Sequence, residues 1–276
     1  LTSITIPNSV KKIECPAFRG CAGLTGIWVD SDNPTYSSNE NGVLFNKEKT
    51  ELICCPGGFS GTYEIPDSVT KVGAYAFSDC ADLTNVIIPD TLSRIGDYAF
   101  YNCTGLTGAI IPDSVTLIAS CAFYKCTALT NVSIGSKAYI QSLAFSRCDN
   151  LSGIWVSPDN LIFSSDENGV LFNKDKTSLV CCPGGISGAY EIPDSVTSIE
   201  YYAFSDCAGL TSVTVPENVT SIGTDAFRNC TGLTDIAISN GVTEIKSSAF
   251  KDCTSLTSIT IPSSVTSIGD GVFGGC

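Results

Sequence analysis

The sequence predicts a β-rich, right-handed solenoid in which short parallel strands stack over about eleven coils. Three observations lead to this fold class. Phenylalanine recurs along the whole chain at a regular spacing, apolar and polar residues alternate over short segments, and no stretch shows sustained helical periodicity. A hydrophobic fraction of 43% is high enough for a buried interior, so a disordered chain is not expected.

The repeat unit is 23 residues long. It is marked by an Ala-Phe pair or a close variant, with phenylalanine at positions Phe18, Phe77, Phe100, Phe123, Phe145, Phe204, Phe227, Phe250 and Phe273. The successive intervals are 59, 23, 23, 22, 59, 23, 23 and 23 residues. Each interval of 59 holds one regular unit and one expanded unit of 36, so the chain contains nine regular 23-residue repeats and two expanded 36-residue units.

A larger duplication includes these units. Residues 24–150 and 151–276 align at an offset of 127, and the segment beginning IWVDSDNP at Ile27 returns as IWVSPDNL at Ile154. We therefore expect one solenoid domain over residues 1–276, built by copying a block of coils. Because residue 1 is a leucine and the chain contains no methionine, we also expect it to be a fragment of a longer protein.

The residues of each repeat predict one strand followed by a turn. In the first repeat, Leu1, Ile4 and Ile6 are predicted to point inward and Ser3 outward, which is the alternation of a strand. Pro7 should end this strand because it cannot donate to a continuing ladder. Turn residues, a second short apolar pair and the Ala-Phe pair follow, and the pattern F-x-x-C-x-x-L leads to the next strand.

The complete motif, L-x-x-I-x-I-P-x-S-V-x-x-I-G-x-x-A-F-x-x-C, resembles the leucine-rich repeat of the BspA or Treponema (TpLRR) type. The N-P-x-Y, G-V-L-F-N-K and P-G-G elements of the expanded unit are also similar to inserts in such proteins. Departures are minor, with Gly135 and Ser239 at the proline position and Val272 in place of alanine. The resemblance implies an extracellular or cell-surface protein of a bacterium or protozoan that binds proteins, cells or surface polymers, and it does not imply catalysis.

Nine of the fifteen cysteines occupy one repeat position, three residues after each phenylalanine. They are Cys21, Cys80, Cys103, Cys126, Cys148, Cys207, Cys230, Cys253 and Cys276. We expect a structural column of buried free thiols along one corner of the coils. Disulfides between neighbours fit less well, because stacked strands keep Cβ atoms near the ~4.8 Å strand spacing, outside the usual window of ~3.5–4.5 Å.

The other six cysteines lie outside this repeat position, and different predictions apply to them. The adjacent pairs Cys54–Cys55 and Cys181–Cys182 lie in identical CCPGG segments, and neighbouring strand residues point to opposite faces, which disfavours a shared metal. Cys15 and Cys121 replace ordinary surface or turn residues of the repeat and are predicted to be the most exposed thiols.

Composition excludes several functions. The chain has no histidine, so Ser-His-Asp catalysis, Cys-His catalysis and His-ligated metals are ruled out. A net charge of −13 with only 15 scattered basic residues argues against nucleic acid, and no apolar run is long enough to insert into a membrane. Asp30, Asp32 and Glu40 raise the possibility of calcium, but their spacing differs from an EF-hand and suits a wide loop. No cofactor or metal is expected.

The outward position of the regular strands gives the candidate ligand-binding residues. Along the chain this column reads Thr5, Trp28, Ile87, Ile110, Ser133, Trp155, Thr214, Ala237 and Thr260. We select Trp28, Ile87, Ile110, Trp155 and Thr214 as a contact surface for a protein or glycan. The alternative is that the loop of each expanded unit folds back over its tryptophan. The expanded coil is also expected to place Glu64 between Trp28 and Ile87.

These observations favour a non-catalytic binding or adhesion module that presents its strand face to a ligand. The alternative function is an architectural spacer, or a targeting repeat region attached to an enzyme or wall-binding domain elsewhere in the parent protein.

Overall fold

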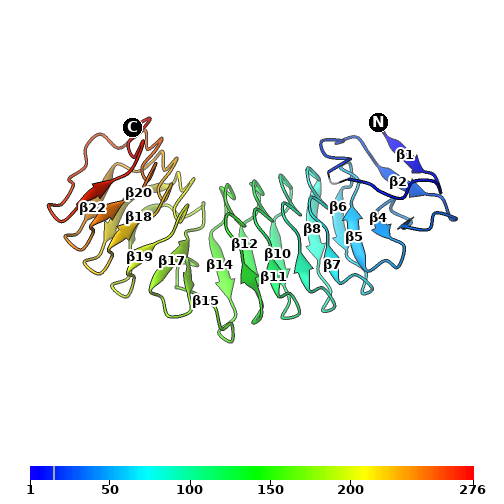
Figure 1. Cartoon of the computed structure of the whole chain (residues 1–276), viewed down its shortest axis with the longest axis horizontal. Helices are drawn as coiled ribbons and strands as arrows, with labels where there is room; N and C mark the ends of the chain where they lie inside the picture. Colours follow the sequence, from blue (N-terminus) through cyan, green and yellow to red (C-terminus); the bar gives the residue numbers. More distant parts are fainter. Residues whose placement is uncertain (15) are drawn as a thin grey trace. The chain divides into compact units, whose positions relative to one another are not determined.

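The computed structural model describes residues 1–14 and 16–276, so Cys15, one of the two thiols expected to be exposed, lies outside the described residues. Two compact units are present, Leu1–Cys148 and Asp149–Cys276 (Figure 1). Each contains one expanded segment followed by regular repeats. That residues 1–276 form one solenoid domain, made by copying residues 24–150, stays a prediction.

The first unit has strands in two rows. The first row is β1 (Ser3–Ile6), β2 (Gly26–Val29), β6 (Gly61–Glu64), β8 (Leu83–Ile87), β10 (Gly108–Ile111) and β12 (Asn131–Ile134). The second row is a seven-stranded sheet of β3 (Tyr36–Ser38), β4 (Leu44–Asn46), β5 (Glu51–Cys54), β7 (Lys71–Val72), β9 (Arg94–Ile95), β11 (Leu117–Ile118) and β13 (Tyr139–Ile140).

The second unit repeats this arrangement. Its first row is β14 (Gly153–Val156), β18 (Gly188–Glu191), β20 (Leu210–Val215) and β22 (Asp235–Ile238). Its second row is a seven-stranded sheet of β15 (Phe163–Ser165), β16 (Leu171–Asn173), β17 (Ser178–Cys181), β19 (Ser198–Ile199), β21 (Ser221–Ile222), β23 (Glu244–Ile245) and β24 (Ser267–Ile268).

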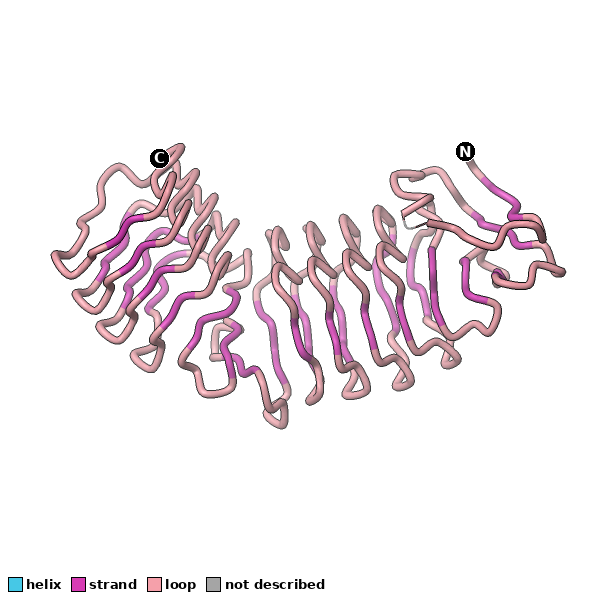
Figure 2. The backbone as a smooth tube through the Cα atoms, in the orientation of Figure 1, coloured by secondary structure: helices cyan, strands magenta, loops and turns pink. Residues whose placement is uncertain are grey.

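The predicted fold class is confirmed. Strands of successive regular repeats pair in parallel, as in Ile110 beside Ser133, and Figure 2 shows strands joined by loops without a helix among the described residues. The structure makes about 12 turns against the eleven coils predicted. None of the described residues belongs to a helix that could cross a membrane.

The expanded units contain the antiparallel strands. In the first unit, β3, β4 and β5 pair antiparallel in that order, and β5 then pairs in parallel with β7. Asn33 is fully buried beneath this hairpin, where its amide donates to the carbonyls of Pro7 and Val10 and its oxygen accepts from the amides of Thr35 and Tyr36. One buried side chain therefore fixes the hairpin to the preceding coil.

The interior follows the repeat. Phenylalanine rings stack from coil to coil, with centroids 4.8 Å apart for Phe77 and Phe100 and 4.9 Å apart for Phe100 and Phe123. In the first strand, Ile6 is buried and Ile4 half-buried as expected, but Leu1 is 74% exposed, so its predicted inward position is wrong. The equivalent leucines of later repeats, such as Leu24 and Leu106, are fully buried, whereas Leu1 belongs to the first coil of the stack.

Two columns of hydroxyls also join the coils. Thr107 donates to the carbonyl of Thr84, and Thr130 donates to that of Thr107. Ser93 and Thr116 repeat this pattern beside the second row of strands. These side chains satisfy carbonyls at the surface, which accounts for the Ser and Thr content of the repeat.

The turn carrying Ala-Phe and the following Cys, residues 75–80 in the coil of Phe77, is here called the arc. Each regular arc from Phe77 onward has two left-handed residues, one two places before and one two places after the phenylalanine, such as Tyr75 (φ 57°) and Asp79 (φ 62°), whereas in the arc of Phe18, residues 16–21, only Gly20 is left-handed. Aspartate or asparagine, which tolerate this conformation, often occupy the second place, but Lys125 (φ 63°) is strained there.

Candidate functional site

The outward residues of the first row are placed by strand register. Thr5 pairs with Trp28, Ile110 with Ser133, and Thr214 with Ala237. We call the outward side of the first row of strands in each unit the strand face; it carries Trp28, Ile87 and Ile110 in the first unit and Trp155 and Thr214 in the second. All five are exposed, the fractions for the four large side chains being 42%, 47%, 76% and 41% in that order.

The strand face is divided by the expanded segment. Glu64 of β6 pairs directly with Ile87 of β8, and β6 therefore separates Trp28 from Ile87. In the second unit, Glu191 of β18 likewise lies beside Thr214. Within each unit, a glutamate therefore interrupts the apolar character of the strand face.

Each tryptophan rests on a glycine of its own strand. A Cβ atom added at Gly26 would lie 2.7 Å from Nε1 and 2.8 Å from Cε2 of Trp28, closer than real Cβ atoms approach other atoms. At Gly153 the corresponding distances to Nε1 and Cε2 of Trp155 are 2.7 and 2.6 Å. Glycine at these positions therefore lets the indole pack over the backbone.

The hairpin turn lies along the strand without covering the tryptophan. The amide of Ile27 donates to the carbonyl of Gly42 at 2.8 Å, and the amide of Val29 donates to Oγ of Ser38 at 3.1 Å. Gly42 has φ +66°, and a Cβ there would lie 2.5 Å from the Cα of Gly26. Because Trp28 is still 42% exposed, the loop does not bury it in a local core.

The second unit repeats this arrangement. The amide of Ile154 donates to Gly169 at 2.9 Å, and that of Val156 donates to Ser165 at 2.9 Å. Gly169 also has a left-handed φ of +70°. The two tryptophan sites are thus equivalent in both burial and hydrogen bonding.

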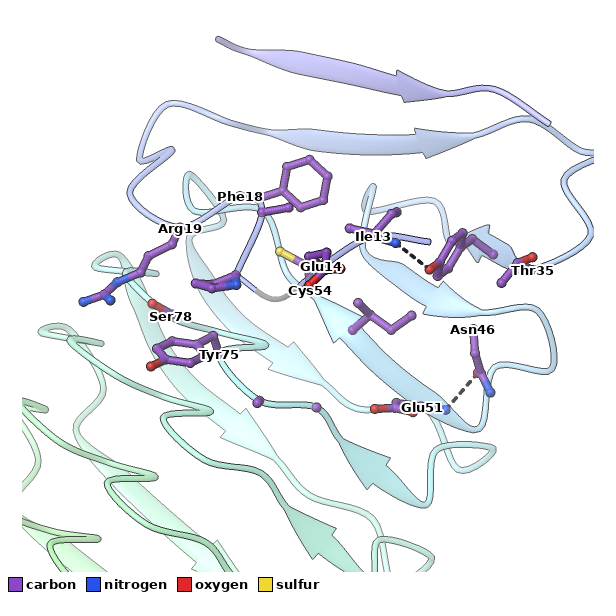
Figure 3. Close-up of a pocket in the computed structure, with 16 residues that line it drawn as sticks. Ile13, Glu14, Phe18, Arg19, Thr35, Asn46, Glu51, Cys54, Tyr75 and Ser78 are labelled. Atoms are coloured by element: carbon purple, nitrogen blue, oxygen red, sulfur yellow. Dashed lines mark hydrogen bonds between the residues drawn. The ribbon is translucent and has the colours of Figure 1, made fainter. Parts of the chain in front are cut away.

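A pocket of about 330 Å³ lies in the first unit (Figure 3). Its apolar lining includes Ile13, Phe18, Tyr36, Ile53, Cys54 and Tyr75, and its polar lining includes Glu14, Arg19, Asn46 and Glu51. Figure 3 shows Phe18, Arg19 and Cys54 among the side chains that line it. Sequence reasoning missed this pocket.

The pocket exists because the expanded unit has no arc. The chain leaves β5 through Cys55, whose amide donates to Ala76 at 2.6 Å, and Gly58 then donates to Leu24. A space consequently opens between the arc of Phe18 and the arc of Phe77. The missing Ala-Phe pair inside the first interval of 59 residues was the signal that could have located it.

The charged groups at the pocket already have partners. Glu51 pairs with Lys71 at 2.7 Å, and Nε of Arg19 lies 3.7 Å from the Asp79 carboxylate. The Arg19 guanidinium also lies 4.6 Å from the ring centroid of Tyr101. The contacts of Arg19 connect the arc of Phe18 to later coils. The charged groups at the pocket therefore serve the packing of the coils.

The repeat-position cysteines form hydrogen bonds between coils. Cys103 donates through Sγ to the carbonyl of Phe77 at 3.0 Å, and Cys126 does the same to Phe100 at 3.0 Å. The bond recurs in the second unit, where Cys230 donates to Phe204 and Cys253 to Phe227, each at 3.0 Å.

Burial along this column is uneven. Seven of the nine thiols are buried, Cys21 is half-buried and Cys276, in the last coil, is exposed. Cys80, Cys103, Cys126, Cys207, Cys230 and Cys253 are free thiols. Burial raises the pKa of Cys126 well above its usual value, which keeps this thiol protonated and able to donate.

Two further cysteine findings extend or correct the sequence analysis. Cys55 and Cys182 are buried, and their carbonyls lie 3.9 and 3.6 Å from the thiols of Cys80 and Cys207. The prediction that Cys121 is exposed is wrong, because it is only 5% exposed. Cys121 occupies the repeat position held by Tyr75 and Tyr98 in the two preceding coils. Tyr98 hydrogen-bonds to Cys121, and this bond raises the pKa of Tyr98 to about 12.

The acidic loop of the first expanded unit uses its oxygens locally. Asp30 accepts from the amide of Asp32, and Asn39 accepts from the amides of Asn41 and Val43. Lys47 donates to the carbonyls of Ser31 and Asn33. Within residues 1–14 and 16–276 there is no cluster of three His, Cys, Asp or Glu residues suited to a metal ion.

Comparison with known proteins gives a consistent result. A family profile described as "BspA type Leucine rich repeat region" matches residues 1–53, 60–166 and 188–276, in six copies. Among solved structures, a leucine-rich cell surface protein of Faecalibacterium prausnitzii is 32% identical, with a TM-score of 0.65, and the match covers 100% of this chain and 71% of that one.

Two other solved structures are similar. A leucine-rich repeat protein of Eubacterium ventriosum is 27% identical over 99% of this chain and 58% of its own, with a TM-score of 0.56. The pneumococcal vaccine antigen PcpA, at 22% identity, covers 99% of this chain and 69% of its own with a TM-score of 0.64, which bears on the fold alone. A search of curated proteins gave no match.

Proposed function

The chain belongs to the family of BspA-type leucine-rich repeat proteins, and from this premise we propose that it is a non-catalytic binding module. The module acts at a bacterial cell surface and presents its strand face to an external protein or glycan. One observation carries the proposal: a half-exposed tryptophan occupies the same strand position in each unit, at Trp28 and Trp155. Large aromatic side chains left accessible on a rigid sheet are typical of contact surfaces.

The construction of the strand face supports this role. Strand register fixes the position of each outward side chain, so the surface needs little ordering when a ligand binds. The surface location is supported by the Faecalibacterium prausnitzii relative, which is described as a leucine-rich cell surface protein. With a net charge of −13, nucleic acid is a poor partner.

A binding experiment with variants on and off the strand face tests the proposal. The protein would be applied to immobilised extracellular-matrix proteins and polysaccharides. Trp28→Ala and Ile110→Ala should weaken the strongest interaction about tenfold or more if they contact the ligand. Tyr139→Ala and Tyr201→Ala are matched controls, because these side chains are 46% and 50% exposed but lie outside the first row of strands.

Two results would contradict the proposal. Binding that depends on Tyr139 or Tyr201 and ignores the strand face would place the contact elsewhere on the surface. Absence of binding to every immobilised ligand would instead favour the spacer function. In each case, an unchanged thermal unfolding midpoint would verify that the variant is folded.

A further inference from the structure

The two tryptophan sites are equivalent, and they differ from the rest of the strand face. The strand sequence Gly-Ile-Trp-Val occurs at residues 26–29 and again at 153–156. In both places the indole packs over the glycine two residues before it. The residue exposures, 42% and 41%, are nearly equal.

This packing leaves part of the indole available to a ligand. The backbone of Gly26 supports one side of Trp28, so the exposed part of the ring lies on the side away from the strand. The hairpin turn beside it fixes the strand that carries the ring, through hydrogen bonds from the amides of Ile27 and Val29. A fixed, partly open aromatic ring can pack against the apolar C–H face of a sugar at little entropic cost.

The surroundings of each ring are polar. Thr5 pairs with Trp28 and is exposed, and the adjoining turn carries exposed Glu40 and Asn41. The turn of the second unit carries exposed Glu167 and Asn168 at the same places. These groups can hydrogen-bond to sugar hydroxyls, whereas a protein hot spot is normally enclosed by further apolar contacts.

The charge of the chain restricts the kind of glycan. A net charge of −13, with a glutamate in the turn adjoining each tryptophan strand, would repel sulfated or uronic-acid polymers. Neutral sugars carry no such penalty. Among these, β-linked pyranose chains keep most substituents at the ring edge and leave an apolar face open for stacking.

From these observations we infer that each unit has one sugar-stacking site, centred on Trp28 and on Trp155, and that the ligand is a neutral β-linked polysaccharide. This inference rests on the proposed binding function and specifies its ligand class. Two equivalent sites on one chain match a ligand that repeats the same chemical unit. Simultaneous engagement of both sites by one polymer raises the overall affinity above that of either site alone.

Tryptophan fluorescence offers a selective test, because the chain contains only these two tryptophans. Trp155→Ala leaves Trp28 as the sole reporter, and Trp28→Ala leaves Trp155. Cellohexaose, xylohexaose and mannohexaose would be titrated into both variants. At least one should shift the emission of both, with dissociation constants that agree within about threefold and lie near the millimolar range.

The corresponding polymer tests the second half of the inference. It should bind the native protein about tenfold or more tightly than either single variant. Tyr139→Ala, which removes an exposed ring outside the first row of strands, should leave sugar binding unchanged. Polygalacturonate, an anionic polymer, should not bind.

Several outcomes would overturn the inference. These are no emission change with any hexaose up to about 10 mM, equal polymer affinity of native and single-variant proteins, or preferential binding of polygalacturonate. Binding of a protein ligand that is lost in Ile110→Ala but retained in both tryptophan variants would overturn the inference and leave the proposed function standing. Retention of all binding in every strand-face variant would overturn both.

Discussion

Replacing Gly26 with alanine should displace Trp28, and the matched change at Gly108 should have little effect. Gly26 and Gly108 occupy the same place in their strands, two residues before an outward side chain. An alanine methyl at residue 26 would lie 2.7 Å from the indole, whereas one at residue 108 meets only the Asn131 carbonyl, at 3.7 Å. The first is a severe overlap and the second an ordinary contact.

The size of the effect follows from the area that the ring would expose. A tryptophan side chain contributes about 150–250 Å² of surface, and more than half of Trp28 is buried. Lifting it from Gly26 would expose on the order of 60 Å², which costs about 1.5 kcal/mol at about 25 cal/mol per Å². Gly26→Ala should therefore lower the free energy of unfolding by about 1.5 kcal/mol, and Gly108→Ala should change it by less than about 0.5 kcal/mol.

Urea denaturation followed by circular dichroism would measure both variants. In a Trp155→Ala background, the emission of Trp28 should also move to longer wavelength when Gly26→Ala is added. Gly153→Ala provides an independent repeat in the second unit. Equal stabilities for Gly26→Ala and Gly108→Ala, with unchanged emission, would refute the view that the indole rests on the glycine.

Three further predictions concern the coils themselves. Lys125→Gly should raise the free energy of unfolding by about 0.5–1 kcal/mol in urea denaturation, because glycine adopts the φ of 63° found at Lys125 without strain. Lys251→Gly, at an arc position without positive φ, should lower it. Burial raises the folded-state pKa of Cys126 above its usual 9.0, so a urea series should show a loss of stability as pH rises above 9.0. Cys126→Ala should remove the part of this slope that one thiol supplies, at most about 1.4 kcal/mol per pH unit. Asn33→Asp should lower the free energy of unfolding by about 3 kcal/mol, because a carboxylate would face the two carbonyls to which the amide now donates. Asn41→Asp, at an exposed position, should change it little. Equal thermal unfolding midpoints for the two variants would contradict this prediction.

The repeat spacing was sufficient to predict the regular coils. Apolar alternation placed Ile4 and Ile6 toward the interior, and the recurrence of Phe100 and Cys103 identified positions that stack because each coil repeats the last. Periodicity carries this information because the same contacts are made many times. A register error would disrupt every coil in the same way.

The expanded units could not be predicted to the same extent. Their 36 residues occur only twice, so no periodicity indicates that β4 runs antiparallel between β3 and β5. The support of Trp28 by Gly26 depends on a side-chain direction that strand alternation does not specify. Cys121 was misjudged because its burial depends on Tyr98 in the neighbouring coil.

The contacts between coils have a mechanical consequence. Phe77 stacks on Phe100, Cys103 donates to Phe77 and Thr130 donates to Thr107, so each of these interactions joins neighbouring coils within a unit. If the ends of a unit were pulled apart, an end coil could peel away while the coils behind it kept their own contacts. Each regular repeat released in this way would lengthen the chain by roughly 75–80 Å. Under tension, such a unit would therefore extend in discrete steps, each corresponding to the unfolding of one coil.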